Sequence, residues 1–309
     1  MTGGLPVAIT GGTGFVGQAV LDVLAKEHRP VEALARTVPQ QAHTSLNWVQ
    51  GSLSDLPSLE RLITGSSAVV HIAGLTSTPD PDEFERANVT GTANVMAAMK
   101  RAGVKRLVFV SSLAARKPDL SAYGASKDKA EQLVEASGLD WTIVRPPAVY
   151  GPRDKDMFEL FRAAKFGLVP LPPSGATSMI HVEDLARLLV TLAVSSSSGS
   201  TRKRIFEPDD GRDGGWSHKE MGQAIGVAMQ RKALALNMPA AVLRGAAKLD
   251  GLFRRSKAKL TPDRVGYMLH PNWVSRSDRA VPQSLWSAQI DGPTGLKMTA
   301  DWYKAQGWL

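Results

Sequence analysis

The sequence predicts an α/β fold in which helices cover both faces of a mainly parallel β-sheet. Over residues 5–151, short apolar segments alternate with longer segments whose apolar residues recur at helical spacing. A glycine-rich stretch, TGGTGFVG (residues 10–17), joins the first apolar segment to the first helical one. Strands that alternate with helices form parallel sheets because each helix carries the chain back across the sheet.

The order of elements follows from these patterns. Strands are expected at residues 5–10, 30–36, 46–53, 67–74, 106–112 and 141–151. Helices are expected between them at 14–27, 56–63, 82–103 and 121–138, and after them at 153–167, 181–194 and 210–230. Gly103 and Gly138 stand at the C-terminal ends of two of these segments, a frequent position for glycine because it adopts the left-handed conformation that ends a helix. The serine-rich stretch 195–204 is expected to be a surface loop.

The glycine-rich stretch predicts a dinucleotide-binding turn. Gly12, Gly14 and Gly17 fit G-x-G-x-x-G, and Gly11, Gly14 and Gly17 fit G-x-x-G-x-x-G. Such a turn lets the backbone approach a pyrophosphate, which then meets the free N–H groups at the start of the helix. A Rossmann-type, doubly wound sheet is therefore expected.

The end of the second predicted strand indicates which dinucleotide is bound. An acidic residue there would bind the ribose 2′-hydroxyl of NAD, but Ala35 occupies this position and Arg36 follows it. An arginine suits a 2′-phosphate, with which it forms paired, charge-assisted hydrogen bonds. The sequence favours NADPH.

A tyrosine and a lysine form the candidate catalytic pair. Tyr123 and Lys127 lie four residues apart at the start of a predicted helix, so both project from one face. A neighbouring ammonium stabilises a phenolate, and Tyr123 could then exchange a proton with a carbonyl or alcohol oxygen. Ser111 and Ser112 end the preceding strand, where a hydroxyl could orient that oxygen.

Seven segments resemble, in order, landmarks of the extended short-chain dehydrogenase/reductase family. They are TGGTGFVG, HIAG, ANVTGTANV, FVSS, YGASK, RPPAVYGP and HVEDLA, and they cover residues 7–186. The resemblance implies Ser112, Tyr123 and Lys127 as the catalytic set, with Asn88 stabilising the central helix. Together with the motif, it places cofactor contacts at Gly11, Gly12, Thr13, Gly14, Phe15, Val16, Gly17, Arg36, Ser52, Leu53, Ala73, Gly74, Tyr123, Lys127, Pro146 and Val149.

The resemblance also implies two domains. A dinucleotide-binding domain is expected at 1–150, and a smaller substrate lobe at 151–309, with residues 181–207 returning to the first domain. Two departures from the family pattern stand out. Gly51-Ser52-Leu53 lacks the aspartate of the usual Gly-Asp-Leu, which weakens the expected adenine contact, and only ten residues separate Ser112 from Tyr123. In this short connection, the chain resembles a divergent subgroup of the family, which includes an accessory subunit of respiratory complex I that has this fold.

Composition and charge place further bounds on function. The 309 residues include no cysteine, and no secretory signal or long apolar run is visible, so we expect a cytoplasmic protein. The net charge is +8, and residues 231–279 alone hold 11 Lys and Arg against 3 Asp and Glu. His71 and His181 are expected to be structural, and no metal is expected.

The stretch 238–260 adds an amphipathic pattern to this positive charge. Val242, Leu243, Ala246, Leu249 and Phe253 are expected along one helical face, with Arg244, Lys248 and Arg255 on another. Such a segment suits contact with an anionic membrane through 231–279, or could cover an apolar substrate. No nucleic-acid partner is expected, and the oligomeric state is not predicted.

The resulting functional prediction is an NADPH-dependent reductase that acts on a ketone of an apolar, lipid substrate. Within the divergent subgroup, the C-terminal half resembles bacterial ceramide reductases, which implies reduction of the 3-keto group of an oxidised ceramide or related sphingolipid precursor. Two alternatives stay open: a sugar-nucleotide epimerase or dehydratase, and a non-catalytic NADPH-binding accessory subunit.

Overall fold

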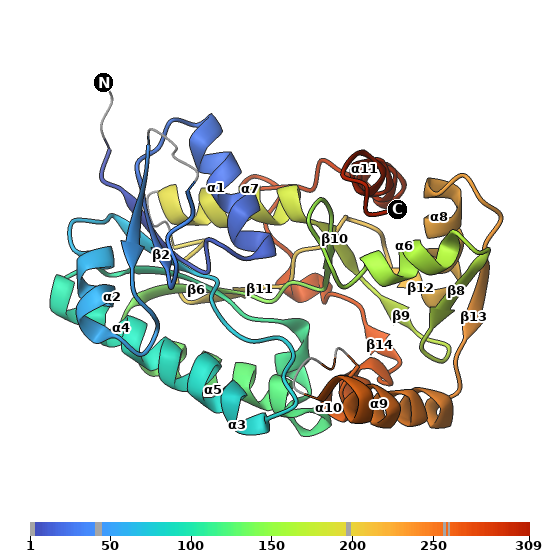
Figure 1. Ribbon diagram of the computed structural model, residues 1–309. Coiled ribbons are helices and arrows are strands. Elements are labelled where there is room, and N and C mark those ends of the chain that lie inside the picture. Colours follow the sequence, from blue (N-terminus) through green and yellow to red (C-terminus); the bar gives the residue numbers. More distant parts are fainter. Residues whose placement is uncertain (1–3, 41–44, 196–198, 256–257, 259) are drawn as a thin grey trace. The chain divides into compact units, whose positions relative to one another are not determined.

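The computed structural model describes residues 4–40, 45–195, 199–255, 258 and 260–309 (Figure 1). The chain divides into two compact units, one formed by Met1–Arg145 with Ala186–Phe206, and the other by Pro146–Leu185 with Glu207–Leu309. Residues 196–198 of the expected serine-rich loop, and Lys257 and Lys259 of the basic segment, lie outside the described residues.

The first unit is built on a seven-stranded parallel sheet, which confirms the predicted fold class. The strand order is β11-β6-β5-β4-β1-β2-β3, with every neighbouring pair parallel. The strands are β1 (Val7–Thr10), β2 (Val31–Ala35), β3 (Leu46–Gln50), β4 (Ala68–His71), β5 (Arg106–Val110), β6 (Asp140–Val144) and β11 (Arg204–Phe206). The order reverses at β1, the topological switch point at which this class of fold binds ligands.

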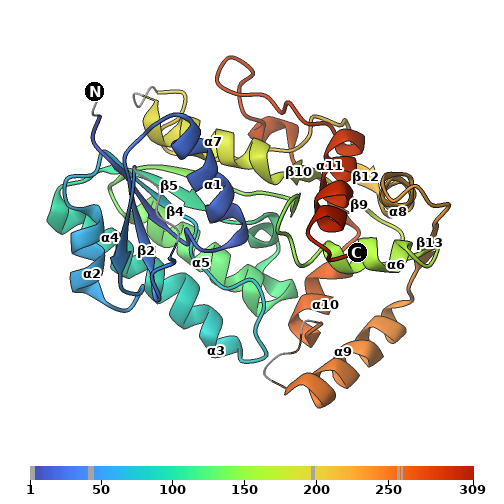
Figure 2. The same ribbon diagram turned by 45° about the horizontal axis from the view of Figure 1, so that its top comes forward.

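Helices cover both faces of this sheet (Figures 1 and 2). Helices α1 and α7 lie on one face, and α2, α4 and α5 lie on the other. The bounds are α1 (Phe15–Lys26), α2 (Leu56–Ile63), α3 (Pro81–Phe84), α4 (Gly91–Ala102), α5 (Ala122–Ala136) and α7 (Val182–Val194). One core lies between the sheet and α2, α4 and α5, where Leu59, Leu62, Met99, Leu107 and Val134 are fully buried.

Two predicted elements are interrupted in the structure. The expected strand at 141–151 ends at Val144 as β6, and after two prolines β7 (Ala148–Tyr150) pairs in parallel with β10 (Met179–His181) instead. Proline has no N–H for a sheet ladder, so the chain leaves the large sheet there. The expected helix at 82–103 is broken by a π-helical turn, η1 (Glu85–Thr90), between α3 and α4.

The second unit contains small sheets and five complete α-helices among its described residues. Its other strands are β8 (Leu168–Leu171), β9 (Ala176–Thr177), β12 (Trp216–Ser217), β13 (Leu234–Asn237) and β14 (Asn272–Trp273). Its helices are α6 (Phe158–Ala164), α8 (His218–Ala228), α9 (Ala240–Arg254), α10 (Pro262–Met268) and α11 (Gly292–Ala305). A core of Tyr150, Phe161, Met221, Leu296 and Tyr303 holds the unit together.

Several C-terminal aromatic residues contribute to this core. The rings of Tyr303 and Trp308 stack at 5.6 Å between centroids, and Phe158 contacts both rings edge-on. These aromatic residues therefore stabilise the second unit.

None of the helices in the described part of the chain is long and apolar enough to span a bilayer.

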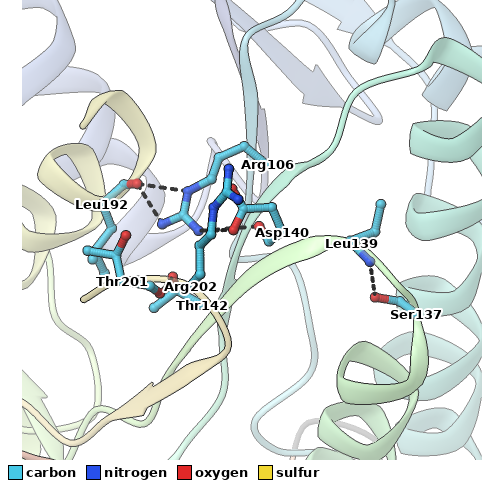
Figure 3. Close-up of polar contacts among 8 residues, drawn as sticks. All are labelled: Arg106, Ser137, Leu139, Asp140, Thr142, Leu192, Thr201 and Arg202. Atoms are coloured by element: carbon cyan, nitrogen blue, oxygen red, sulfur yellow. Dashed lines mark hydrogen bonds and ion pairs between the residues drawn. The ribbon is translucent and has the colours of Figure 1, made fainter. Parts of the chain in front are cut away.

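A buried arginine ties the returning segment to the sheet of the first unit (Figure 3). Arg106 donates from Nε and Nη2 to the carbonyl oxygen of Leu192 in α7, at 3.1 and 2.7 Å. Its Nη1 donates to the Asp140 carbonyl oxygen at 3.2 Å and lies 3.6 Å from the Asp140 carboxylate. Burial lowers the pKa of Arg106, and the Asp140 charge opposes that shift. The hydroxyl of Thr142 also donates to the Thr201 carbonyl oxygen at 2.6 Å.

Replacing this arginine should destabilise the fold. Arg106→Ala would leave the Leu192 carbonyl and the Asp140 carboxylate without their buried partner, and we expect a loss of about 3–5 kcal/mol in the free energy of unfolding. The control is Arg202→Ala, because Arg202 pairs with the same carboxylate at 3.2 Å but is 55% exposed, so its loss should cost about 0–1 kcal/mol. Urea denaturation followed by circular dichroism measures both. Equal losses would contradict the buried role of Arg106.

Candidate functional site

The glycine-rich turn after β1 is shaped by close backbone contacts. Gly11 has a φ of +79°, and a Cβ on it would lie 2.7 Å from the backbone nitrogen of Ala73. A Cβ on Gly17 would lie 2.0 Å from the Gly11 carbonyl oxygen. No other residue type fits at these two positions without moving the backbone. The turn therefore brings the start of α1 directly against the end of β1.

The start of α1 is open toward solvent and has no acidic side chain. Gly14 caps the helix without a side-chain hydrogen bond, and the first turn contains no Asp or Glu. Thr13 and Gly14 are exposed, and Phe15 and Val16 are half-buried. The free N–H groups of this turn and the positive end of the helix dipole suit an anionic group such as a pyrophosphate.

Parallel register brings the other predicted cofactor contacts of the first unit to the same edge of the sheet. Ile9 in β1 pairs with Ala33 in β2, and Ala35 at the end of β2 pairs with Gln50 in β3. Arg36 follows β2, is exposed, and forms no ion pair with another residue of the described chain. Ser52 and Leu53 follow β3 and are half-buried.

An asparagine in the π-helical turn links the end of β4 to helix α5. Its side chain accepts from the Leu75 N–H at 2.7 Å and donates to the Leu75 carbonyl oxygen at 3.0 Å. Asn88 Nδ2 also donates to Ser126 Oγ at 2.9 Å. Gly74 lies against this contact, because a Cβ there would be 2.7 Å from Asn88 Oδ1 and 3.7 Å from Lys127 Nζ. Asn88 therefore sets the position of the backbone that borders Lys127.

Tyr123 and Lys127 occupy the first two turns of α5, as the spacing predicts. Ser121 caps the helix by accepting from the Gly124 N–H at 2.9 Å. Gly124 permits close packing, because a Cβ there would lie 2.8 Å from the Ala114 carbonyl oxygen. The ring of Tyr123 packs 5.8 Å from that of Phe84. The helix start is therefore held closely against the segment that follows β5.

Burial changes the acidity of the lysine. Lys127 Nζ donates to the Val110 carbonyl oxygen at 2.8 Å and lies 4.9 Å from the centroid of the Phe109 ring. Burial lowers its pKa to about 8, and the negative charge of Glu131 opposes this shift. Lys127 is therefore a buried cation at neutral pH that loses its proton in mildly alkaline solution.

The two serines after β5 have different surroundings. Ser111 is buried, and its hydroxyl donates to the Glu131 carboxylate, which also accepts from Arg145 Nε at 2.9 Å. Ser112 is half-buried, and its hydroxyl accepts from the Ala114 N–H at 3.2 Å, capping the short helix η2 (Leu113–Arg116). The Ser111 hydroxyl is thus used by a buried ion pair, whereas Ser112 presents its hydroxyl at the edge of the sheet.

His71 belongs to a buried hydrogen-bond chain. Its Nδ1 lies 2.6 Å from the Thr10 hydroxyl, and its Nε2 lies 3.0 Å from the Thr92 hydroxyl. Because the Thr92 hydroxyl donates to the Asn88 carbonyl oxygen, His71 Nε2 donates to Thr92 and Nδ1 accepts from Thr10. Burial, reinforced by the Lys127 charge, lowers the pKa of His71 to about 3, so the ring stays neutral.

The structure adds positioning residues that the sequence motifs do not identify. Ser126 relays the Asn88 contact by donating to the Tyr123 carbonyl oxygen at 2.8 Å, and Glu131 engages Ser111. Their only sequence signal is helical spacing from Tyr123 and Lys127, which places Glu131 one turn beyond Lys127.

Among the described residues, no group of three His, Asp or Glu side chains could hold a metal ion. Pro146 and Val149 belong to the second unit, Pro146 after β6 and Val149 within β7.

Comparisons with known proteins agree with this arrangement. Residues 11–195 match a protein family described as NAD(P)H-binding. The chain is similar to a ceramide reductase of Caulobacter vibrioides, with 34% identity over 98% of this chain and 96% of the relative. It is also 34% identical, over 62% of the chain and 65% of the relative, to a 4-hydroxy-2-methyl-3-oxo-4-farnesyl-3,4-dihydroquinoline-1-oxide ketoreductase of Stigmatella aurantiaca.

A solved structure shows the same fold. MoeE5, in complex with UDP-glucuronic acid and NAD, aligns with a TM-score of 0.75 at 24% identity and covers 97% of this chain and 99% of that protein. The family match covers more than half of the chain, and the relative from Caulobacter vibrioides extends the similarity through both units. The chain therefore belongs to the NAD(P)H-binding family, as an NAD(P)-dependent oxidoreductase of the extended short-chain dehydrogenase/reductase type.

Proposed function

We propose that this protein is an NADPH-dependent reductase of a ketone on a long-chain lipid, with the 3-keto group of an oxidised ceramide or related sphingolipid precursor as its substrate. The observation that carries the proposal is the similarity to a ceramide reductase over 98% of the chain. This similarity includes the second unit, in which proteins of this type bind the substrate. A match confined to the glycine-rich half would support only the cofactor.

The glycine turn and its surroundings fit a dinucleotide. Gly11 and Gly17, which leave no room for a Cβ, bring the backbone close to the N-terminus of α1. The first turn of this helix contains no carboxylate that would repel a pyrophosphate. Arg36 is exposed at the neighbouring strand end and is available for a 2′-phosphate, and Ala35 provides no carboxylate to bind a 2′-hydroxyl. We therefore favour NADPH over NADH.

Three side chains would process the carbonyl group. NADPH, when bound, supplies the hydride that reduces the carbonyl carbon. Ser112 would orient the carbonyl oxygen by hydrogen bonding, and Tyr123 would donate its hydroxyl proton to that oxygen as the alcohol forms. Lys127, a buried cation beside the Gly74 backbone, would hold the nicotinamide ribose and stabilise the tyrosinate left behind.

An apolar ketone is the substrate class that these groups suit. A keto group between alkyl chains offers one polar atom, which two hydroxyls satisfy, and an apolar channel supplies most of the remaining binding. The second similar relative is named as a ketoreductase of a farnesylated ring, which is also an apolar ketone. Both names support reduction of a carbonyl rather than modification of a sugar.

A sugar-nucleotide epimerase or dehydratase is the alternative. The solved relative contains a UDP-sugar, but at 24% identity it indicates the fold alone. The connection between Ser112 and Tyr123 is short and consists of η2 and η3 (Pro118–Leu120), which pack against the start of α5. No residues remain there for the longer insert that helps to cover a sugar nucleotide in many such enzymes.

The intact Tyr123 and Lys127 pair argues against a non-catalytic subunit.

The substrate proposal is tested by turnover. We expect the wild-type protein to oxidise NADPH in the presence of a 3-keto ceramide in detergent micelles and to produce the secondary alcohol, detected by mass spectrometry. Tyr123→Phe keeps the ring but removes the proton, so it should abolish turnover while NADPH still binds. Lys127→Ala should impair both turnover and binding. Conversion of UDP-glucose with no reduction of the keto-lipid would overturn the proposal, and near-normal turnover by Tyr123→Phe would overturn its role.

The cofactor proposal is tested by titration. Arg36→Ala should weaken NADPH binding by about 1.5–3 kcal/mol, the usual cost of losing a hydrogen bond to a charged group, and leave NADH binding unchanged. The control is Arg29→Ala, because Arg29 is an exposed arginine just before β2, at the opposite end of that strand from Arg36. Isothermal titration calorimetry measures each affinity. Equal affinities for the two cofactors, unchanged in Arg36→Ala, would contradict the assignment.

The lowered pKa of Lys127 predicts a pH dependence. Because burial lowers the pKa of Lys127 to about 8, its ammonium is present below that pH and is lost above it. We expect kcat/KM for the ketone to fall above about pH 8. In Glu131→Gln, removal of the carboxylate that raises this pKa should move the fall to lower pH. A profile that is level to pH 10, or is the same in both proteins, would exclude Lys127 as the titrating group.

A further inference from the structure

Helix α9 of the second unit exposes an apolar face to solvent. Phe253 is 80% exposed, Leu252 71% and Leu249 56%. Val242, one heptad before Leu249, is also exposed. Residues separated by three, four or seven positions share one face of a helix, so these four side chains form a continuous outward stripe, here called the α9 outer face.

The opposite side of α9 is docked within its own unit. Leu243 and Ala247 are buried and pack with Val265 of α10, the neighbouring helix in Figure 2. The sequence pattern places Leu243 on the same face as Val242, Leu249 and Phe253. This placement is wrong, because Leu243 is buried whereas the other three side chains are exposed. Contact with α10 therefore leaves most of the apolar surface of α9 uncovered within its unit.

Basic side chains run along one edge of the α9 outer face. Arg244 and Lys248 are exposed and are separated by four positions, so they form a second stripe beside the apolar one. Arg255, the exposed C-cap residue of α9, adds positive charge at the end of the helix. The acidic residue of this helix, Asp250, is turned away from it. Its carboxylate pairs with Arg254 at 3.3 Å and accepts from the Leu260 N–H at 2.9 Å. The α9 outer face therefore has positive charge at its border and no carboxylate.

We propose that the α9 outer face docks on the surface of an anionic lipid bilayer. A helix with large apolar side chains outward and a basic stripe beside them lies in the interface of a membrane, with the apolar side chains among the acyl chains and the cations among the phosphates. The charge of the wider segment agrees, since residues 231–279 hold 11 basic and 3 acidic residues. This inference does not depend on the substrate of the enzyme.

A second copy of the chain fits this surface less well. In a symmetric dimer the same patch faces itself, so the basic stripe would approach an identical stripe with no carboxylate on the face to neutralise it. An anionic lipid surface supplies the missing negative charge without requiring a matching shape. Charge complementarity therefore selects the membrane as the occupant.

Vesicle flotation tests the proposal with the full-length protein. We expect wild-type protein to float with phosphatidylglycerol–phosphatidylcholine vesicles at low salt, and to float much less at high salt or with phosphatidylcholine alone. Arg244→Gln/Lys248→Gln/Arg255→Gln should lower the partition coefficient by roughly 100-fold, because each basic residue near an anionic surface contributes about fivefold. Leu249→Gln/Leu252→Gln/Phe253→Gln should abolish flotation.

Two matched controls keep the result specific to α9. Lys219→Gln/Lys297→Gln/Lys304→Gln removes the same net charge from α8 and α11, and Phe166→Thr/Leu168→Thr/Leu234→Thr removes three exposed apolar side chains elsewhere in the unit. Both should float like the wild type, and all four variants should keep wild-type circular dichroism and NADPH binding. Absence of salt-sensitive flotation, or equal losses in the controls, would overturn the proposal. A wild-type dimer in sedimentation that the α9 apolar variant dissociates would identify a second copy as the occupant instead.

Discussion

The backbone contact between Gly11 and Gly17 is the constraint on which the nucleotide side of this protein depends. A Cβ at Gly17 would lie 2.0 Å from the Gly11 carbonyl oxygen, so the end of β1 and the start of α1 meet with no side chain between them. That contact directs the first N–H groups of α1 toward the carboxyl edge of the sheet. Parallel register then brings the ends of β2, β3, β4 and β5 to the same edge. The position of the nucleotide-binding edge of the sheet thus depends on the close backbone contact between Gly11 and Gly17.

Asn88 connects that edge to helix α5. Asn88 lies in the π-helical turn, and its side-chain amide forms hydrogen bonds with both the N–H and the carbonyl oxygen of Leu75. The backbone after β4 thereby gains partners for these two groups. Through Ser126 the same amide reaches the backbone of Tyr123. A buried polar network of this kind is favourable only when every member has a partner. The interruption of the central helix is therefore part of how Tyr123 and Lys127 are positioned, and the neutral His71 beside it completes the same chain of hydrogen bonds.

Charge is distributed differently in the two units. In the first unit, buried charges are paired or hydrogen-bonded: Arg106 with Asp140 and Leu192, Glu131 with Arg145 and Ser111, and Lys127 with the Val110 carbonyl. In the second unit, the basic residues of α9 lie in solvent next to apolar side chains. The first arrangement holds the buried side chains in one geometry. The second is suited to contact with a charged, apolar surface outside the protein.

The sequence by itself determined the alternation of strands and helices, the glycine turn, and the spacing of Tyr123 and Lys127, because these depend on local periodicity and on residues close together along the chain. It also placed Arg36 at the end of a strand. Only the tertiary structure decided three other points. The break at Glu85–Thr90 depends on the hydrogen bonds of Asn88 to Leu75, 13 residues away. The different roles of Ser111 and Ser112 depend on Glu131, 20 residues beyond Ser111. The face that α9 buries depends on α10, because periodicity shows that a helix has an apolar side but cannot show which of its apolar residues a neighbouring helix will cover.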